Sequence, residues 1–202
     1  MRPNPHVSPP QCRIALPQRQ AVRSDPAACI RSSSATHITC TPALLTMLGD
    51  PSSVPTLLCV AVGGEALPHN LMQQWMHGSC RLLVTYGVTE VTVYQTIHDV
   101  AAEGELQSVK GSLIGSALQG VGAAVVDSDE VLVARGQPGQ IVLFGSQLAF
   151  GYVGQEDGAD AGGFRPLNLG EGRGRVPAYF TGDGGTMLSD GQLVFHGRFD
   201  CF

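Results

Sequence analysis

The sequence predicts an α/β protein, in which a helix-covered, largely parallel sheet is followed by a small antiparallel β subdomain. Between residues 26 and 104, helical segments alternate with strand-like segments that are apolar on both faces, a pattern typical of parallel sheets covered by helices. After residue 105, short strands are joined by turns rich in Gly and Asp, which accept positive φ at low cost. These turns favour antiparallel pairing in the second half.

Local signals justify each element of the first half. Thr41 and Pro42 mark a helix start, because threonine caps helix N-termini and proline fits the first turn. A continuous apolar run of strand length ends at Gly63-Gly64. The predicted elements are helices at 26–34, 42–48 and 68–76 and strands at 38–40, 57–62 and 81–85.

The second half is expected to contain short strands joined by tight turns. Asp127-Ser128-Asp129 and Asp190-Gly191 indicate hairpins, and the Gly-rich stretch 158–175 is expected to be a long surface loop. The predicted strands are 123–126, 131–134, 141–144 and 193–195. The predicted division of the chain is an unstructured leader at 1–25, the end of an α/β sheet subdomain at 26–104, a β-barrel-like subdomain at 105–197 and the start of a hinge at 198–202.

The first 35 residues hold five arginines against one aspartate, so they carry +4 within a chain whose net charge is −5. An Arg-rich, Ser-containing start is compatible with a transit peptide. Five prolines before residue 18 interrupt the amphipathic helix that such a signal needs. They favour an unstructured leader or an artefact of the chain start.

Composition argues against several classes of partner. The net charge is negative and lysine occurs once, so we expect no nucleic acid as a partner. Apolar stretches fall short of about 18 residues, so no membrane span is predicted. The six cysteines form no C-x-x-C pair and mostly lie in apolar runs, which indicates reduced thiols and a cytoplasmic location.

Several common catalytic motifs do not occur. The sequence has no G-x-S-x-G elbow, no H-E-x-x-H and no G-x-x-x-x-G-K-[ST], and Gly120-x-Gly122 lacks the third glycine of a dinucleotide fingerprint. The six histidines lack metal-ligand spacing, so each is interpreted as a packing or surface residue. Serine hydrolases, zinc enzymes and Rossmann dehydrogenases are therefore disfavoured.

Three polar clusters remain, each at a predicted strand end or turn, where α/β sheets bind ligands. The first cluster, residues 60–68, contains Gly63-Gly64, which lets the backbone approach a flat ligand, followed by Glu65. Taken alone, this cluster is more simply a strand-to-helix turn with Glu65 near the helix N-terminus.

The second cluster, Thr85-Tyr86-Gly87-Val88-Thr89-Glu90, follows a buried strand. A tyrosine can stack on a purine, a threonine hydroxyl can donate to a phosphate, and a carboxylate can hold Mg²⁺. Gly87 permits a sharp turn that aims these groups together. The alternative is a helix start capped by Thr89, with Tyr86 in the core.

The third cluster is Tyr179-Phe180-Thr181-Gly182-Asp183, followed by Gly197-Arg198-Phe199-Asp200. The two oxygens of Asp183 match the two donors of a ribose 2′,3′-diol, and Arg198 adds a planar fork of donors. Taken alone, Thr181-Gly182-Asp183 is an ordinary turn.

In this order, the three clusters resemble the adenylate-forming (AMP-binding) superfamily, which includes nonribosomal-peptide adenylation domains, acyl-CoA synthetases and luciferases. The resemblance covers about residues 21–202 and also includes Pro138-Gly139-Gln140 and Gly151-Tyr152. The run Tyr86 to Val91, with Val88 where proline is usual, is most similar to the β-alanine-activating enzyme.

The resemblance implies that ATP and Mg²⁺ are the cofactors and gives each matching residue a role. The implied catalytic residues are Thr89, at the α-phosphate, and Glu90, as the Mg²⁺ ligand. The implied nucleotide site comprises Gly64, Glu65, Ala66 and Tyr86 around adenine, Thr89, Asp183 on the ribose hydroxyls, and Arg198; the substrate pocket comprises Thr39, Ala61, Gly63, Thr85, Val93 and Tyr94; and Asp200 is the hinge.

The chain departs from the family pattern near the nucleotide. Val84 stands where asparagine is usual, Gln140 replaces a glutamate, Phe150 lies where arginine is common, and Phe195 replaces a tyrosine. The Gly- and Ser/Thr-rich phosphate loop, the lid with its catalytic lysine and the aspartate that anchors substrate amines do not occur in these 202 residues, and Lys110 cannot replace the lid lysine by position.

These observations predict a fragment of an ATP-dependent ligase that makes acyl-AMP from an amino or carboxylic acid, followed by thioester formation on CoA or a phosphopantetheine carrier domain. The attacking group is already a carboxylate anion, so the reaction needs no general base. We expect little or no turnover from the isolated chain. The alternatives are a non-catalytic nucleotide- or acyl-binding module and a truncated structural remnant.

Overall fold

The computed structural model describes residues 13–15, 19–76, 78, 80–100, 111–154, 162–170 and 172–199. Its helices are α1 (Arg19–Ser24), α2 (Pro26–Ser33), α3 (Pro42–Leu48) and α4 (His69–Met76), with 3₁₀ turns η1 (Pro51–Ser53) and η2 (Thr89–Val91). Its strands are β1 (His37–Cys40), β2 (Cys59–Gly63), β3 (Arg81–Tyr86), β4 (Thr96–Asp99), β5 (Ser112–Ala117), β6 (Val121–Val126), β7 (Pro138–Gly145), β8 (Phe164–Asn168), β9 (Arg175–Met187) and β10 (Leu193–Arg198).

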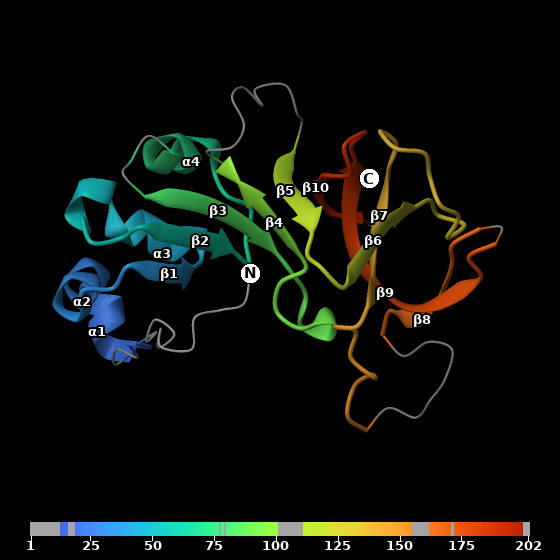
Figure 1. The fold of residues 1–202 in the computed structure, drawn as a ribbon, viewed down its shortest axis with the longest axis horizontal. Coiled ribbons are helices and arrows are strands. Elements are labelled where there is room, and N and C mark those ends of the chain that lie inside the picture. Colours follow the sequence, from blue (N-terminus) through green and yellow to red (C-terminus); the bar gives the residue numbers. More distant parts are fainter. Residues whose placement is uncertain are drawn as a thin grey trace, which may run out of the picture.

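The strands form one continuous mixed sheet, with the order β1-β2-β3-β4-β5-β10-β9-β7-β6 and β8 paired to β9. Strands β1, β2 and β3 are parallel, and every pairing from β3–β4 onward is antiparallel. The helices gather around the parallel end, and β6 to β10 make the opposite end of the molecule (Figure 1). The predicted α/β class is confirmed.

The core of the first half lies where the helices pack on the parallel strands. Helix α3 contacts β2, and α4 contacts β3. Leu45, Val60, Val62 and Trp75 are all fully buried in this cluster. The Thr41 side chain accepts a hydrogen bond from the Leu44 N–H at 3.3 Å, so the predicted N-cap of α3 is confirmed. Within the described part of the chain, none of the helices has the length and hydrophobicity needed to span a membrane.

The N-terminal prediction is wrong for residues 19–24, which form α1 where an unstructured leader was expected. Asp25 ends this helix with a backbone bond to the Ala21 carbonyl, and its side chain caps α2 by accepting from the Ala28 N–H at 2.8 Å. Residues 1–12 and 16–18 of the leader lie outside the described residues. The predicted boundary at 104/105 also falls outside them, and the four-part division of the chain stays a prediction.

The second half contains more sheet than the sequence predicted. The predicted strands at 123–126, 141–144 and 193–195 lie within β6, β7 and β10. The prediction of a strand at 131–134 is wrong, because this segment makes a single bridge from Leu132 to Val126 and leaves its apolar side chains mostly exposed. The predicted loop at 158–175 contains β8. Strands β4, β5, β8 and β9 were not predicted.

A bulge in β9 replaces the turn that Thr181-Gly182-Asp183 suggested. Gln140 on β7 pairs with Gly184, but Val142 pairs with Phe180, so three residues of β9 face one residue of β7. Gly182 has φ +71°, which glycine adopts at low cost. A bulge bends its strand and redirects a side chain. This one places Asp183 directly across from Arg198 on β10.

The loop between β3 and β4 holds two consecutive β-branched residues in the left-handed region. Thr92 has φ +64° and Val93 has φ +65°. Such a conformation costs a residue on the order of 1–3 kcal/mol and persists only where the surrounding structure enforces it. Val93 is 64% exposed, so packing contributes little to hold its conformation.

We expect Val93→Asn to stabilise the protein by about 1 kcal/mol, because asparagine tolerates the left-handed region far better than valine. Thermal unfolding followed by circular dichroism measures the change. Val131→Asn is the matched control, since Val131 is 59% exposed and has no positive φ. The control should change stability by less than about 0.5 kcal/mol. Equal effects of the two substitutions would contradict the strain at Val93.

Candidate functional site

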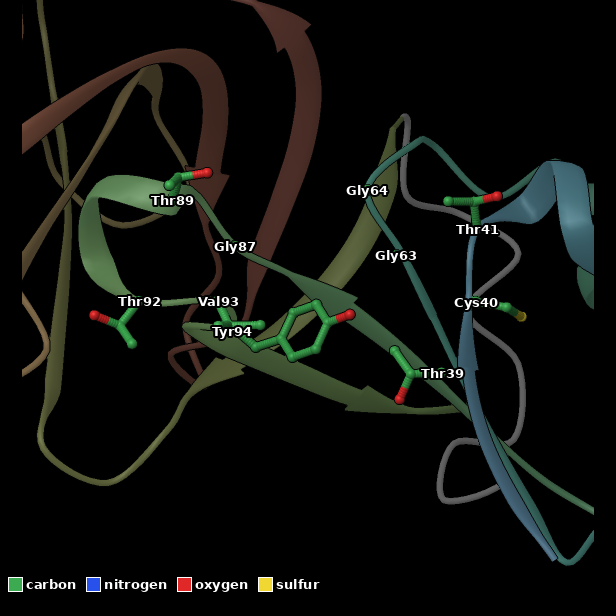
Figure 2. Close-up of a pocket in the computed structure, with 10 residues that line it drawn as sticks. All are labelled: Thr39, Cys40, Thr41, Gly63, Gly64, Gly87, Thr89, Thr92, Val93 and Tyr94. Atoms are coloured by element: carbon green, nitrogen blue, oxygen red, sulfur yellow. The ribbon is translucent and has the colours of Figure 1, made fainter. Parts of the chain in front are cut away.

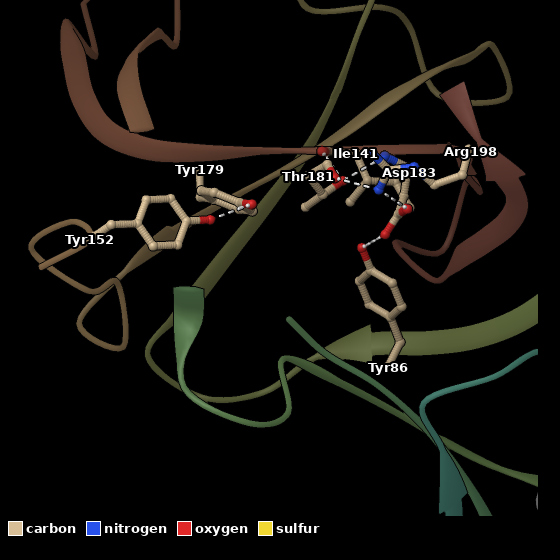
Figure 3. A network of polar contacts seen from close by, with 7 residues as sticks. All are labelled: Tyr86, Ile141, Tyr152, Tyr179, Thr181, Asp183 and Arg198. Atoms are coloured by element: carbon tan, nitrogen blue, oxygen red, sulfur yellow. Dashed lines mark hydrogen bonds and ion pairs between the residues drawn. The ribbon is translucent and has the colours of Figure 1, made fainter. Parts of the chain in front are cut away.

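Tyr86 at the end of β3 and Asp183 in the β9 bulge meet although 97 residues separate them. The Tyr86 hydroxyl donates to Asp183 Oδ2 at 2.7 Å. Arg198 Nη1 donates to Asp183 Oδ1 at 3.1 Å and to the Thr181 carbonyl at 3.1 Å (Figure 3). The network therefore joins the parallel strands to the antiparallel half.

The bulge itself holds Asp183 in place. The Thr181 hydroxyl donates to the Ile141 carbonyl at 2.8 Å and accepts from the Asp183 N–H at 3.0 Å. A Cβ atom on Gly182 would lie 2.5 Å from Arg198 Nη2, so the approach of Arg198 requires glycine there. The Asp183 side chain is 12% exposed.

The network leaves Asp183 able to bind further hydroxyl groups. A carboxylate has about four lone-pair positions, and Tyr86 and Arg198 take one on each oxygen. Burial raises the pKa of Tyr86, and the negative charge and hydrogen bond of Asp183 raise it further. The phenol therefore stays protonated and donates.

Glu90 belongs to a separate group of polar contacts. The Tyr152 hydroxyl donates to Glu90 Oε1, and the Tyr152 and Tyr179 hydroxyls lie 3.3 Å apart. Partial burial alone would raise the pKa of Glu90, but hydrogen bonds from Tyr152, its own backbone and Tyr179 together lower it. Glu90 is therefore ionised at neutral pH. Figure 3 shows Tyr152 and Tyr179 to one side of the Tyr86–Asp183 contact.

An open cavity of about 580 Å³ lies at the carboxyl ends of β1 and β2, against the loop that follows β3. Figure 2 shows the end of β1 on one side and the 89–93 turn on the other. Burial raises the pKa of the Cys40 thiol to about 11, so this thiol stays protonated. The lining carries several hydroxyl groups and no charged side chain: Thr39, Cys40, Thr41, Gly63, Gly64, Gly87, Thr89, Thr92, Val93 and Tyr94.

The structure brings part of the predicted substrate pocket together. The cavity takes in four of the predicted substrate residues and two of the predicted nucleotide residues: Thr39, Gly63, Val93 and Tyr94, with Gly64 and Thr89. Ala61 and Thr85 are not in its lining, and the Thr85 hydroxyl is buried and donates to the Val62 carbonyl at 3.2 Å. Glu65 and Ala66 are exposed in the turn after β2, and Asp200 lies outside the described residues.

The turn that carries Thr89 differs from the helix start weighed as an alternative. The cap position of η2 is Val88, which makes no side-chain cap, so a capping role for Thr89 is wrong. Tyr86 is half-buried with its ring centroid 6.0 Å from that of Phe195, and it combines partial core packing with the contact to Asp183. A Cβ on Gly87 would lie 2.0 Å from the Val93 carbonyl oxygen, so the loop requires glycine here.

The described residues fit a magnesium ion that arrives with phosphates. Among them, no three His, Cys, Asp or Glu side chains gather into a metal site. Glu90 supplies one ionised carboxylate beside the cavity-lining Thr89. Mg²⁺ usually takes one or two protein carboxylates and completes its coordination with substrate phosphates and water.

Three polar residues have structural roles that the sequence did not reveal. Tyr152 was noted only as part of Gly151-Tyr152, and its contact with Glu90 spans 62 residues. Thr181 bridges the β9 bulge, and Gln95 is fully buried within the loop after β3. The glycine after Thr181 was the available signal for the bulge. A single glutamine in an apolar segment gives no comparable signal.

Tyr152→Phe tests the contact with Glu90 through pH. A carboxylate whose pKa is lowered by folding adds stability above its unfolded pKa, and that stability is lost as pH falls through the folded pKa. We therefore expect Tyr152→Phe to cost about 0.5 kcal/mol near pH 7, because the pair is partly exposed, and progressively less below the ordinary glutamate value of 4.5. Thermal unfolding between pH 3 and pH 7 measures this difference.

The control for this test is the same substitution in a Glu90→Gln background, where the pH dependence of the difference should vanish. A deficit that is constant with pH in the original background would show that Tyr152 stabilises the protein through packing alone.

The sequence of this chain is similar to those of several synthetases and biosynthesis proteins. The chain is 33% identical to the hybrid PKS-NRPS synthetase TAS1 of Pyricularia oryzae, over 84% of this chain and 10% of that protein. It is 32% identical to novobiocin biosynthesis protein H of Streptomyces niveus, over 93% of this chain and 30% of that protein. The chain thus spans between a tenth and three tenths of the length of these relatives.

A solved structure has the same fold. PA1221, an NRPS protein containing adenylation and PCP domains, superimposes with a TM-score of 0.71 at 28% identity, over 85% of this chain and 35% of that one. The finer resemblance to the β-alanine-activating enzyme stays a prediction. The family model described as AMP-binding enzyme matches residues 12–153, which is more than half of the chain. The chain therefore belongs to the AMP-binding family of adenylate-forming enzymes.

Proposed function

We propose that this chain supplies the nucleotide-binding part of a ligase that joins ATP and a carboxylic or amino acid into acyl-AMP and pyrophosphate. The observation that carries the proposal is the contact of Tyr86 and Arg198 with the Asp183 carboxylate, in a chain of the AMP-binding family. Three distant segments thereby present an aromatic ring, a carboxylate and a guanidinium at one place.

Each residue has a role that suits its surroundings. Asp183 accepts hydrogen bonds from both ribose hydroxyls, and Arg198 keeps its carboxylate oriented. Tyr86 and the 64–66 turn lie on either side of adenine. The Thr89 hydroxyl donates to the α-phosphate. Glu90 would hold Mg²⁺, which would supply positive charge to offset the negative charge of the leaving pyrophosphate.

The cavity at the ends of β1 and β2 receives the side chain of the acid. Its hydroxyl-rich, uncharged lining favours an acid whose side chain is neutral. Ala61 lies on β2, which contributes Gly63 to this lining, and Thr85 lies near the end of β3, two residues before the lining residue Gly87. The acid needs no catalytic base, because its carboxylate is already the nucleophile, so the protein's task is to hold two anions together.

The acceptor of the acyl group is a phosphopantetheine thiol, on a carrier domain or on CoA. PA1221 contains a PCP domain beside its adenylation domain, which supports the carrier domain. We place the protein in the cytoplasm. Four described cysteines are free thiols, which supports a reducing setting: Cys29, Cys40, Cys59 and Cys80.

Calorimetric titration of the 202-residue chain with AMP, adenosine and 2′,3′-dideoxyadenosine tests the nucleotide site. We expect the wild-type chain to bind adenosine better than the dideoxy analogue, because only adenosine can donate to Asp183. Asp183→Asn should reduce this preference about tenfold, since hydrogen bonds to a charged group are worth about 1.5–3 kcal/mol. Asp190→Asn, in an exposed hairpin turn, should leave it unchanged.

Two results would contradict the proposal. Wild-type chain that binds none of the three compounds has no nucleotide site. Equal loss of adenosine and dideoxyadenosine binding in Asp183→Asn would make Asp183 a structural residue of the bulge. Because we expect little or no turnover from this chain alone, binding without pyrophosphate exchange agrees with the proposal, whereas exchange would show that the chain is itself catalytically active.

A further inference from the structure

We infer that Gln95 is a positioning residue that holds the Thr89–Val91 turn in place for the nucleotide's phosphate. This inference rests on the proposed function, in which Thr89 and Glu90 act at the α-phosphate and Mg²⁺. Gln95 itself would touch neither the phosphate nor Mg²⁺, because its side chain is fully buried and bonds to the backbone of the turn.

The Gln95 amide ties both ends of the turn together. Its Oε1 accepts from the Val88 N–H at 2.7 Å, and its Nε2 donates to the Val91 carbonyl at 2.9 Å. The turn's own backbone bonds, from Val91 to Val88 and from Thr92 to Thr89, are both 3.2 Å. One buried side chain therefore makes shorter hydrogen bonds to the turn than the turn makes within itself.

The turn needs an external hold because the two residues after it are strained. Thr92 and Val93 have left-handed φ values, which β-branched residues adopt only under constraint. The Thr92 hydroxyl donates to the Gln147 carbonyl at 2.9 Å, and the Ala149 N–H donates to the Glu90 carbonyl at 2.8 Å. These two hydrogen bonds connect the turn to the 147–149 segment. The Gln95 amide connects the two ends of the turn to each other.

The nucleoside contacts do not depend on the turn. Tyr86 belongs to β3 and Asp183 to β9, and they bind each other directly. The Gln95 backbone N–H donates to the Tyr86 carbonyl at 2.9 Å, a bond that survives any change of the side chain. Loss of the Gln95 amide should therefore weaken the recognition of phosphate and leave the recognition of adenosine intact.

The ratio of AMP affinity to adenosine affinity reports this difference. Gln95→Met removes both side-chain hydrogen bonds while keeping an unbranched buried side chain of similar size. We expect this variant to reduce the ratio about tenfold, with adenosine affinity unchanged within twofold, in calorimetric titrations of the full chain. The concentration of Mg²⁺ needed for half-maximal ATP binding should rise as well.

Thr96→Val is the matched control. Thr96 is the next residue, is equally buried, and donates from Oγ1 to the Ile114 carbonyl at 2.6 Å on β5, away from the turn. Loss of the Thr96 hydroxyl should lower the melting temperature and leave the ratio of AMP affinity to adenosine affinity at the wild-type value. Gln95→Asn keeps an uncharged amide that is one methylene shorter and cannot make both hydrogen bonds at their present lengths, so its ratio should lie between wild type and Gln95→Met.

The outcomes separate this inference from the function on which it rests. Equal loss of AMP and adenosine binding in Gln95→Met would overturn the positioning role, because a structural residue affects both. If Gln95→Met does not fold, an unchanged ratio in Gln95→Asn overturns it. Wild-type chain that binds neither compound would overturn the proposed function and this inference together, whereas a wild-type ratio retained in both variants overturns the inference alone.

Discussion

The arrangement depends on one charge, the carboxylate of Asp183, which is nearly buried between the two halves of the sheet. A buried charge is tolerated only when it is paired and hydrogen-bonded. Tyr86 comes from the last parallel strand and Arg198 from the final described strand, and each bonds to one carboxylate oxygen. The bulge in β9 and the absence of a side chain at Gly182 make the contact between Asp183 and Arg198 possible. The side chain that joins the two halves is thus also the one that we propose to bind the ribose hydroxyls.

The loop after β3 is constrained in a different way. Backbone crowding makes Gly87 necessary, and the left-handed pair Thr92 and Val93 keeps the loop in a conformation that it would not adopt by itself. Strain of this kind is concentrated at ligand-binding segments, because the surrounding protein holds the chain in a single geometry. The cavity lies against this same loop, so its shape depends on the strained backbone as much as on side chains.

Glu90 shows how the antiparallel half contacts the turn that we propose to bind the phosphate. Its carboxylate is hydrogen-bonded by Tyr152, from the segment after β7, and that segment also bonds to the backbone of the turn. The sequence suggested that Tyr86, Thr89 and Glu90 point to a common place because they lie within five residues. In the structure Tyr86 is turned to Asp183 and Glu90 to Tyr152, so a phosphate would lie between two separately supported groups.

The sequence alone determined helices α2, α3 and α4 and the parallel strands, and it identified Tyr86, Glu90 and Asp183 as polar groups of interest. The cap at Thr41 and the apolar run of β2 are signals between near neighbours, and they act without the rest of the fold. Strand β9 and the roles of Thr181, Tyr152 and Gln95 were decided only by the tertiary structure. A strand containing proline and several glycines looks like a turn until its partners are known. The bond from Tyr86 to Asp183 spans 97 residues, and no local preference encodes an interaction whose two partners meet only when the whole sheet has formed.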